Sequence, residues 1–154
     1  MSDVGKKVAL KEHGLKPESF RLDIDGKMYK TVEHYFQSKR QPTDDFADKV
    51  LQTPTANDAK KLNTKLKKLL KSTLSQQDES KLMLKGLRAK FSQNEDLKKA
   101  LLSTGYIKLH EGAGRSGGGR WGLRKDKSEG GDELGRLLTI VRSELQTQQQ
   151  ELDQ

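Results

Sequence analysis

The sequence contains no cysteine and only three histidines among its 154 residues. The missing cysteine excludes disulfide bridges, thiolate nucleophiles and zinc sites with cysteine ligands. The histidines are scattered, without the short spacing at which two of them bind a metal on one helix face. We therefore expect a protein that works without a metal ion and without a cofactor.

Long apolar stretches are missing as well. No run approaches the ~20 apolar residues of a membrane-spanning helix, and no apolar signal-peptide core follows Met1. The sequence therefore predicts no membrane contact and an intracellular location, in the cytoplasm or, in a eukaryotic host, in the nucleus. We further expect a monomer.

Hydrophobic residues are scarce. They make up 31% of the chain against 34% charged residues, so the core must be small and drawn from amphipathic helices. The length fits one domain. We expect a flexible arm over 1–19, which has no sustained period, one folded domain over 20–145, and a flexible glutamine-rich tail over 146–154.

Charge is abundant, and it is mainly positive. Lys and Arg total 30 against 22 Asp and Glu, a net charge of +8 that favours anionic partners such as nucleic acid, phosphorylated metabolites or dinucleotides. Lysines concentrate between Lys60 and Lys71, opposite a seam of leucines. Two interpretations of this segment stay open: a solvated surface helix, or a face that binds nucleic-acid phosphates.

The spacing of apolar residues predicts an α+β fold that is predominantly helical, a compact single domain with a small β-hairpin. The hairpin covers Arg21 to Tyr29, because Asp25-Gly26 accepts the positive φ angles of a tight turn. Thr31 then caps a helix that ends near Gln41. The elements predicted after it are helices around Phe46, from about Asp58, over 77–91 and after Asn94, a short strand over 106–109, and a helix from about Leu134.

The helix after the hairpin carries two adjacent aromatics in a chain that has few. Glu33, Gln37 and Arg40 follow three- and four-residue steps, so a carboxylate, an amide and a guanidinium point the same way. Glu33 also fits an ordinary first-turn carboxylate that the helix dipole favours. Tyr35 and Phe36 fit the core as well as the wall of a site.

Two other residues have competing interpretations. His34 is read as a surface or capping residue rather than a catalyst, because no second histidine or carboxylate is spaced to work with it. Trp121 is the only tryptophan and lies in a glycine-rich stretch, EGAGRSGGGRWGLRKDKSEGGDELG. A linker does not require a tryptophan, so this side chain is either a stacking platform or an anchor for the loop.

The motifs VEHYFQ, LRAKF, LLSTG, WG and LGRLL follow one another in this order over residues 22–145. This combination resembles the NADAR, or YbiA-like, family. The resemblance implies a compact, mostly helical fold with a small β component. It also implies an N-glycosidase, because members cleave N-glycosidic bonds of ribosylated intermediates or remove ADP-ribose from guanine. ADP-ribose or a phosphorylated, ribosylated nucleotide is the ligand that it implies.

The resemblance also assigns roles to residues. Cleavage at ribose C1′ develops positive charge on the sugar. A nearby carboxylate can stabilise this charge or can orient the attacking water. Glu33 is the residue implied for this catalytic role. The residues implied to bind the substrate are Tyr35 and Phe36 as walls of the site, Gln37, Arg40, Glu111, Arg120, Trp121, Gly122 and Asp132.

The chain departs from the family pattern in several places. Arg40 stands where members often carry a lysine that could form a Schiff base, and an arginine cannot do so because it stays protonated. Three glycines over 117–119 replace an acidic residue before the WG pair. Asn63-Thr64 replaces a Gly-Arg pair, and Asn63 tolerates the left-handed conformation expected of that glycine.

Two alternatives to an enzyme stay open, and the departures support the first of them. One is a degenerate domain that binds ADP-ribose-like ligands or nucleic acid without turnover. The other is a basic module that binds phosphate backbones through Lys60 to Lys71, with an affinity that falls steeply as salt rises.

Overall fold

The computed structural model describes residues 20–41, 43–67, 74–110, 120–121 and 132–153. These residues form two compact units, one that ends at Asn94 and one that begins at Glu95, and each is described by itself. The described chain is mostly helical with one two-stranded antiparallel sheet, so the predicted fold class is confirmed. No helix within the described ranges is long and apolar enough to cross a bilayer.

The first unit opens with the predicted hairpin. Strand β1, Asp23–Ile24, pairs antiparallel with β2, Lys27–Met28. Asp25 and Gly26 have φ angles of 55° and 82°, the two positive values that a two-residue hairpin turn needs. The Asp23 carboxylate accepts the Gly26 N–H at 3.1 Å, which closes the turn.

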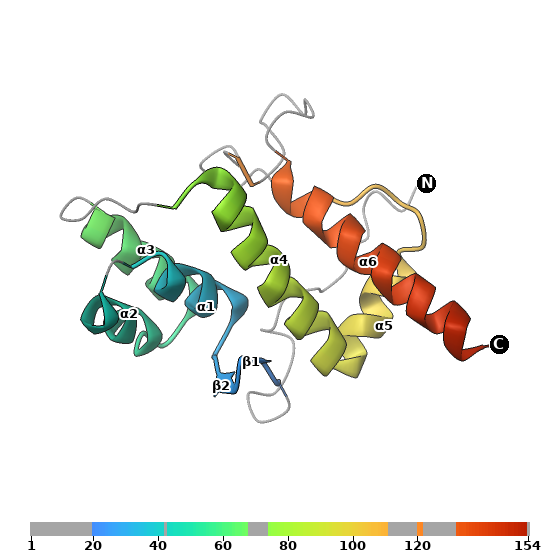
Figure 1. Ribbon diagram of the computed structural model, residues 1–154, viewed down its shortest axis with the longest axis horizontal. Helices are drawn as coiled ribbons and strands as arrows, with labels where there is room; N and C mark the ends of the chain where they lie inside the picture. Colours follow the sequence, from blue (N-terminus) through green and yellow to red (C-terminus); the bar gives the residue numbers. More distant parts are fainter. Residues whose placement is uncertain (1–19, 42, 68–73, 111–119, 122–131, 154) are drawn as a thin grey trace. The chain divides into compact units, whose positions relative to one another are not determined.

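Helix α1, Val32–Lys39, is the central helix of this unit. It packs against α2, Asp44–Leu51, α3, Ala56–Lys67, and α4, Gln76–Gln93, which surround it in Figure 1. Contact on several sides explains why six of its eight residues are buried although the helix has no wide apolar stripe. Burial of an aromatic side chain stabilises a fold by about 2–3 kcal/mol, and α1 buries two of them, Tyr35 and Phe36.

The helices around α1 begin where capping residues allow. The Thr31, Thr43 and Ser75 side chains accept backbone N–H groups at the starts of α1, α2 and α4. For α3 the cap is Thr55, which accepts the Asp58 N–H at 3.1 Å. Each of these side chains satisfies a backbone N–H that has no partner within the helix.

Two of these helices share a small apolar core. Val50 of α2 and Ala59 and Leu66 of α3 are buried together, with Phe46 and Leu62 packed against them. Asn63, which lies between these apolar positions, is an ordinary helical residue of α3. The expected left-handed conformation at Asn63 is therefore wrong, since Asp25 has the one positive φ among non-glycine residues in the part of the chain that is described.

The second unit consists of α5, Glu95–Ser103, and α6, Glu133–Leu152, which pack on each other. After α5, Gly105 takes a φ of 58° and reverses the chain, as expected of a glycine past a helix end. The buried Arg142 of α6 donates to Thr104 Oγ1 at 2.8 Å and to the Ile107 carbonyl at 2.7 Å. Burial lowers the pKa of this guanidinium.

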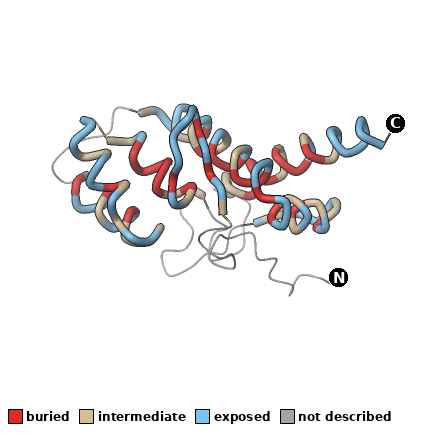
Figure 2. The backbone as a smooth tube through the Cα atoms, turned by 90° about the horizontal axis from the view of Figure 1, so that it is seen from below, coloured by how far each residue is buried: buried red, intermediate tan, exposed pale blue. Residues whose placement is uncertain are grey.

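Two predictions from the sequence can be compared with the structure of this unit. The strand predicted over 106–109 is wrong, because these residues form no ladder and Tyr106 is 86% exposed. The glutamine-rich segment that the sequence sets apart as a tail continues α6 as far as Leu152. Figure 2 shows that the buried positions of α6 give way to exposed ones in its last turns.

Candidate functional site

The side chains of Glu33, Gln37 and Arg40 form a hydrogen-bonded row along α1, as their spacing predicts. The Gln37 amide donates to Glu33 Oε1 at 2.6 Å. Arg40 Nη1 donates to Gln37 Oε1 at 3.1 Å. Glu33 is half-buried and Gln37 is buried, so the carboxylate is the member of the row nearer to solvent.

Two residues outside α1 hold the middle of this row. Asn63 of α3 donates its amide to Gln37 Oε1, the same oxygen that Arg40 contacts. Gln41 in turn donates to Asn63 Oδ1 at 2.6 Å and to the backbone carbonyl of Gln37 at 3.1 Å. These bonds could not be predicted from the sequence, because 26 residues separate Asn63 from Gln37.

Arg40 is held from three sides. Besides its bond to Gln37, its Nε lies 3.3 Å from Glu79 Oε2 of α4, and its guanidinium lies 5.3 Å from the centre of the Phe36 ring. A planar, permanently charged group suits this arrangement better than a flexible amine does. Arg40 therefore supplies a fixed positive charge at one end of the row.

Tyr35 and Phe36 are core residues. They are 1% and 2% exposed, and Tyr35 packs edge-on against Tyr29 with ring centres 5.1 Å apart. Burial raises the pKa of both tyrosines. These contacts favour the interpretation of Tyr35 and Phe36 as core residues. Their burial fixes the position of α1.

His34 was expected to be a surface or a capping residue. It is fully buried, so the surface interpretation is wrong, whereas its bonds to the N-cap Thr31 agree with the capping interpretation. Its backbone N–H donates to Thr31 Oγ1, and that hydroxyl donates to His34 Nδ1 at 2.8 Å. Nε2 donates to the Thr53 carbonyl at 2.8 Å, which requires the tautomer with its proton on Nε2. Burial lowers the pKa of His34, so the ring is neutral at pH 7.

In the second unit, Arg120 and Trp121 form a cationic, aromatic pair. The guanidinium carbon lies 4.4 Å from the centre of the indole ring. Their backbone carbonyls accept the Glu133 and Leu134 N–H groups at 3.1 and 3.0 Å. Arg120 Nη2 also lies 3.8 Å from Glu133 Oε2, so the pair is attached to the first turn of α6.

Asp132 lies beside this pair, at the N-cap position of α6, and is bonded to His110. Gly135 allows the segment around His110 to approach, because a Cβ there would overlap the backbone oxygen of Leu109. The pairing of His110 with Asp132 was not predicted from the sequence, in which His110 stands out only as the neighbour of the predicted site residue Glu111. Glu111 and Gly122, two further predicted site residues, lie outside the described residues.

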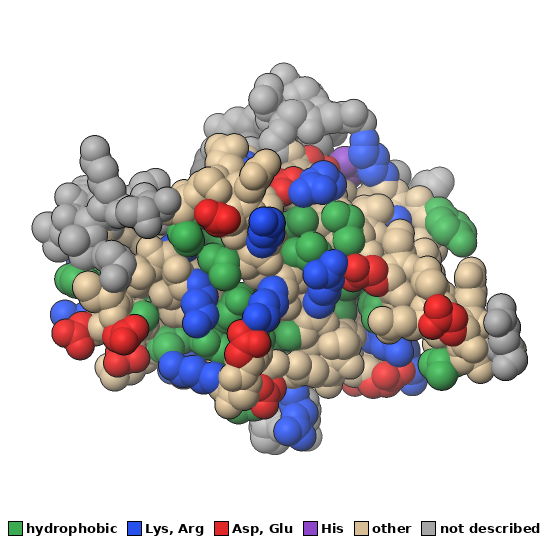
Figure 3. Space-filling model, viewed as in Figure 1, with side chains coloured by type: hydrophobic (Ala, Val, Ile, Leu, Met, Phe, Trp, Pro, Cys, Tyr) green, Lys and Arg blue, Asp and Glu red, His purple; other side chains and the backbone are tan. Residues whose placement is uncertain are grey.

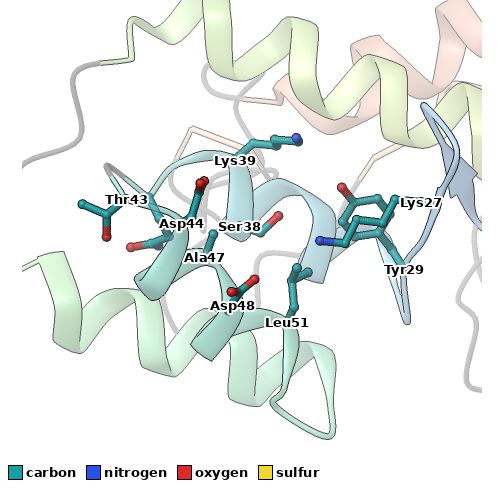
Figure 4. Close-up of a pocket in the computed structure, with 10 residues that line it drawn as sticks. Lys27, Tyr29, Ser38, Lys39, Thr43, Asp44, Ala47, Asp48 and Leu51 are labelled. Atoms are coloured by element: carbon teal, nitrogen blue, oxygen red, sulfur yellow. The ribbon is translucent and has the colours of Figure 1, made fainter.

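A polar hollow of about 390 Å³ lies in the first unit, and Glu33 does not line it. In Figure 4, Asp44 and Asp48 form its wall on α2, and Lys27 and Tyr29 approach from the hairpin. Charges of both signs line it, so it has no net preference for an anion. Among the described residues, no group of histidines and carboxylates has the arrangement of a metal site.

Basic side chains gather on the outer faces of α3 and α4. Lys60, Lys61 and Lys65 are exposed on α3. On α4 the exposed Lys81, Lys85 and Arg88 follow helical spacing, and Figure 3 shows Lys and Arg side chains gathered over this helix. Lys85 is paired with Asp25 at 2.6 Å.

Comparison with known proteins gives a consistent result. The family model of the NADAR domain matches residues 6–146. The chain is 30% identical to the N-glycosidase YbiA of Escherichia coli K12 over 124 residues, which are 80% of this chain and 75% of that protein. It is also 30% identical, over 81% of its own length, to 33% of the riboflavin biosynthesis protein VVA0006 of Vibrio vulnificus.

A solved structure is similar as well. The NMR structure of E. coli YbiA matches with a TM-score of 0.71 at 26% identity, covering 86% of this chain and 77% of that one.

Proposed function

Because the chain belongs to the NADAR family, we propose that it hydrolyses the N-glycosidic bond of a phosphorylated, ribosylated nucleotide such as an ADP-ribose adduct. Glu33 is the catalytic residue in this proposal. The observation that carries it is the bond from Gln37 to Glu33 Oε1, which fixes the direction of a carboxylate that remains partly open to solvent.

The proposed reaction needs a carboxylate and a water molecule. As the C1′–N bond breaks, its electron pair moves to the base nitrogen, which takes up a proton from solvent. Water adds to C1′ and gives up a proton to Glu33, which passes it to solvent. Until the water adds, the positive charge on the ribose is stabilised by the carboxylate of Glu33.

The proposed mechanism does not include a covalent imine between residue 40 and the ribose. An arginine does not act as an amine nucleophile, and this one is engaged by Gln37 and Glu79. Arg40 serves instead as a positive charge for a phosphate or a sugar hydroxyl of the substrate. Direct attack by water is the route that the residues of α1 support.

The Arg120–Trp121 pair has the chemistry of a nucleotide-binding element. An indole ring stacks on any nucleobase, and an adjacent guanidinium suits a phosphate. We assign Trp121 to base stacking, Arg120 to the phosphates, and Asp132 to a hydroxyl of the ligand.

One experiment tests the proposed activity. Titration calorimetry measures binding of ADP-ribose, and chromatography then measures release of ADP-ribose from ADP-ribosylated guanosine. Glu33→Gln should lower kcat by about 100-fold or more. The matched control is Glu95→Gln, which neutralises an exposed carboxylate in the first turn of α5. Equal rates for wild type and Glu33→Gln would refute the role of Glu33.

A second candidate function is binding without turnover. It is favoured by Arg40, since the amine that many relatives carry there is replaced by an ion-paired guanidinium. Tight binding of ADP-ribose with no release from ADP-ribosylated guanosine, and none from a phosphorylated ribosylamine, would establish it.

A further alternative is nucleic-acid binding by the basic face of α3, where three exposed lysines lie. Affinity for DNA or RNA that falls steeply between low and moderate salt, with no response to ADP-ribose, would favour it.

A further inference from the structure

The carboxylate of Glu33 ends a series of three side-chain amides that crosses from the α1–α2 connection to α3 and back to α1. Gln41 donates to Asn63, Asn63 donates to Gln37, and Gln37 donates to Glu33. Asn63 and Gln37 are 9% and 4% exposed, so water has little access to the middle of the series.

The direction of every amide in this series is fixed by groups that have one possible role. Gln41 Nε2 faces the backbone carbonyl of Gln37, which only accepts, so this end of the Gln41 amide must be its NH₂. That NH₂ also faces the Asn63 side chain, so Asn63 must accept the hydrogen bond with its amide oxygen. The Asn63 NH₂ then necessarily faces the Gln37 side chain.

The other end of the series imposes the same direction. Arg40 Nη1 only donates, so the Gln37 atom beside it must be the amide oxygen. With its oxygen held by Arg40 and Asn63, Gln37 can only turn its NH₂ toward Glu33. Reversal of any one amide would set donor against donor or acceptor against acceptor at two contacts or, for Gln37, at three.

We propose that Asn63 is a positioning residue that acts through Gln37: it holds the Gln37 amide so that an N–H donor always faces the Glu33 carboxylate. A donor to an ionised carboxylate forms a short, directional, charge-assisted bond, which fixes the orientation of the carboxylate. The catalytic significance rests on the proposed function, because a carboxylate that stabilises positive charge on ribose must be ionised and correctly aimed.

The test replaces Asn63 by a group of the same shape and the opposite hydrogen-bonding role. Asn63→Asp places an acceptor against Gln37 Oε1 and forces the Gln37 amide to reverse or to leave the row. Asn57→Asp is the matched control, since it adds the same charge to α3 at an exposed position of the first turn.

A second variant disturbs the same bond between Asn63 and Gln37, but from Gln41, which is only half-buried. Gln41→Glu places an acceptor against Asn63 Oδ1, so Asn63 must turn its NH₂ toward position 41 and away from Gln37. This variant keeps the test decisive if Asn63→Asp fails to fold. Its control is the exposed Gln77→Glu in the first turn of α4.

Two readouts are required. The first is the side-chain NH₂ resonance of Gln37 in ¹H–¹⁵N spectra, assigned by its loss in Gln37→Glu. In wild type one of its protons should be shifted downfield and exchange slowly with water, and both features should be lost in Asn63→Asp and Gln41→Glu. The second is kinetics, in which kcat should fall about 10- to 100-fold with little change in KM.

The outcomes separate this inference from the proposed function. An unchanged Gln37 resonance in a folded Asn63→Asp or Gln41→Glu protein would overturn it, as would a changed resonance with kcat no lower than in the controls. If the wild type has no glycosidase activity, the proposed function and the catalytic meaning of Asn63 both fall. The resonance would then still decide whether Asn63 orients Gln37.

Discussion

Gly86 of α4 faces Val32 of α1 so closely that a Cβ on this glycine would lie 2.9 Å from Cγ1 of Val32 and 3.3 Å from the Tyr35 ring. The two helices therefore meet at a point where one of them has no side chain. Val32 and Tyr35 are themselves buried, so neither can move aside without disturbing the core around α1.

Gly86→Ala should lower the stability of the protein. Alanine favours a helix by up to about 1 kcal/mol over glycine, but overpacking a tight contact costs about 1–3 kcal/mol, so we expect a net loss near 1 kcal/mol. Urea unfolding measures this loss. Ser92→Ala, at an exposed position of the same helix, is the control. A more stable Gly86→Ala protein would mean that α1 and α4 do not pack this closely.

Stability should fall as the pH drops below the ordinary pKa of histidine, about 6.5. Burial lowers the pKa of His34 in the folded state, so the unfolded chain binds a proton first and is favoured as the solution becomes acidic. The stabilisation is complete above pH 6.5 and is lost toward the lower folded-state pKa. Urea unfolding at pH 7.5 and 5.5 measures the difference.

The control for this pH effect is His34→Gln, which removes the titrating ring. It should flatten the dependence of the unfolding free energy between these two pH values. A wild-type protein equally stable at both values would contradict the burial of a neutral His34.

Arg40→Lys should destabilise the protein by about 1–2 kcal/mol, because an ammonium cannot keep the contacts to Gln37, Glu79 and the Phe36 ring together. Lys39→Arg, the reverse exchange at the exposed neighbouring position, should change stability by less than about 0.5 kcal/mol. Thermal unfolding compares the two variants. A gain in glycosidase activity in Arg40→Lys would support the degenerate-domain alternative.

Binding of ADP-ribose should quench the fluorescence of Trp121, which is the only tryptophan and therefore reports without interference. Arg120→Ala should weaken the binding about fivefold, which corresponds to a contact of about 1 kcal/mol. Arg136→Ala is the control, since Arg136 also pairs with Glu133 but is not stacked on the indole. A titration with no fluorescence change would place the ligand away from Trp121.

The parts of the fold that could be predicted are those set by neighbours in the sequence. The Asp25-Gly26 turn, the cap at Thr31 and the seam of α3 each depend on residues within four positions of one another. The strand expected over 106–109 failed for the opposite reason. The Ile107 carbonyl accepts a hydrogen bond from Arg142, 35 residues later, instead of one from a neighbouring strand. Among the described residues there is no further strand with which this segment could pair.

The candidate site divides in the same way. The row of Glu33, Gln37 and Arg40 follows from helical spacing, whereas the contribution of Asn63 depends on how α3 packs on α1. The capping role of His34 could be predicted from its distance to Thr31 in the sequence, but its burial could not, because its buried partner Thr53 lies 19 residues away. Long-range pairs of this kind leave no periodic signal in the sequence.

The first turn of α6 has no side-chain cap, and the carbonyls of Arg120 and Trp121 take that place. Displacement of the Arg120–Trp121 backbone would therefore release two amide protons of the helix, those of Glu133 and Leu134. The exchange of these protons with deuterium is thus tied to the position of the tryptophan.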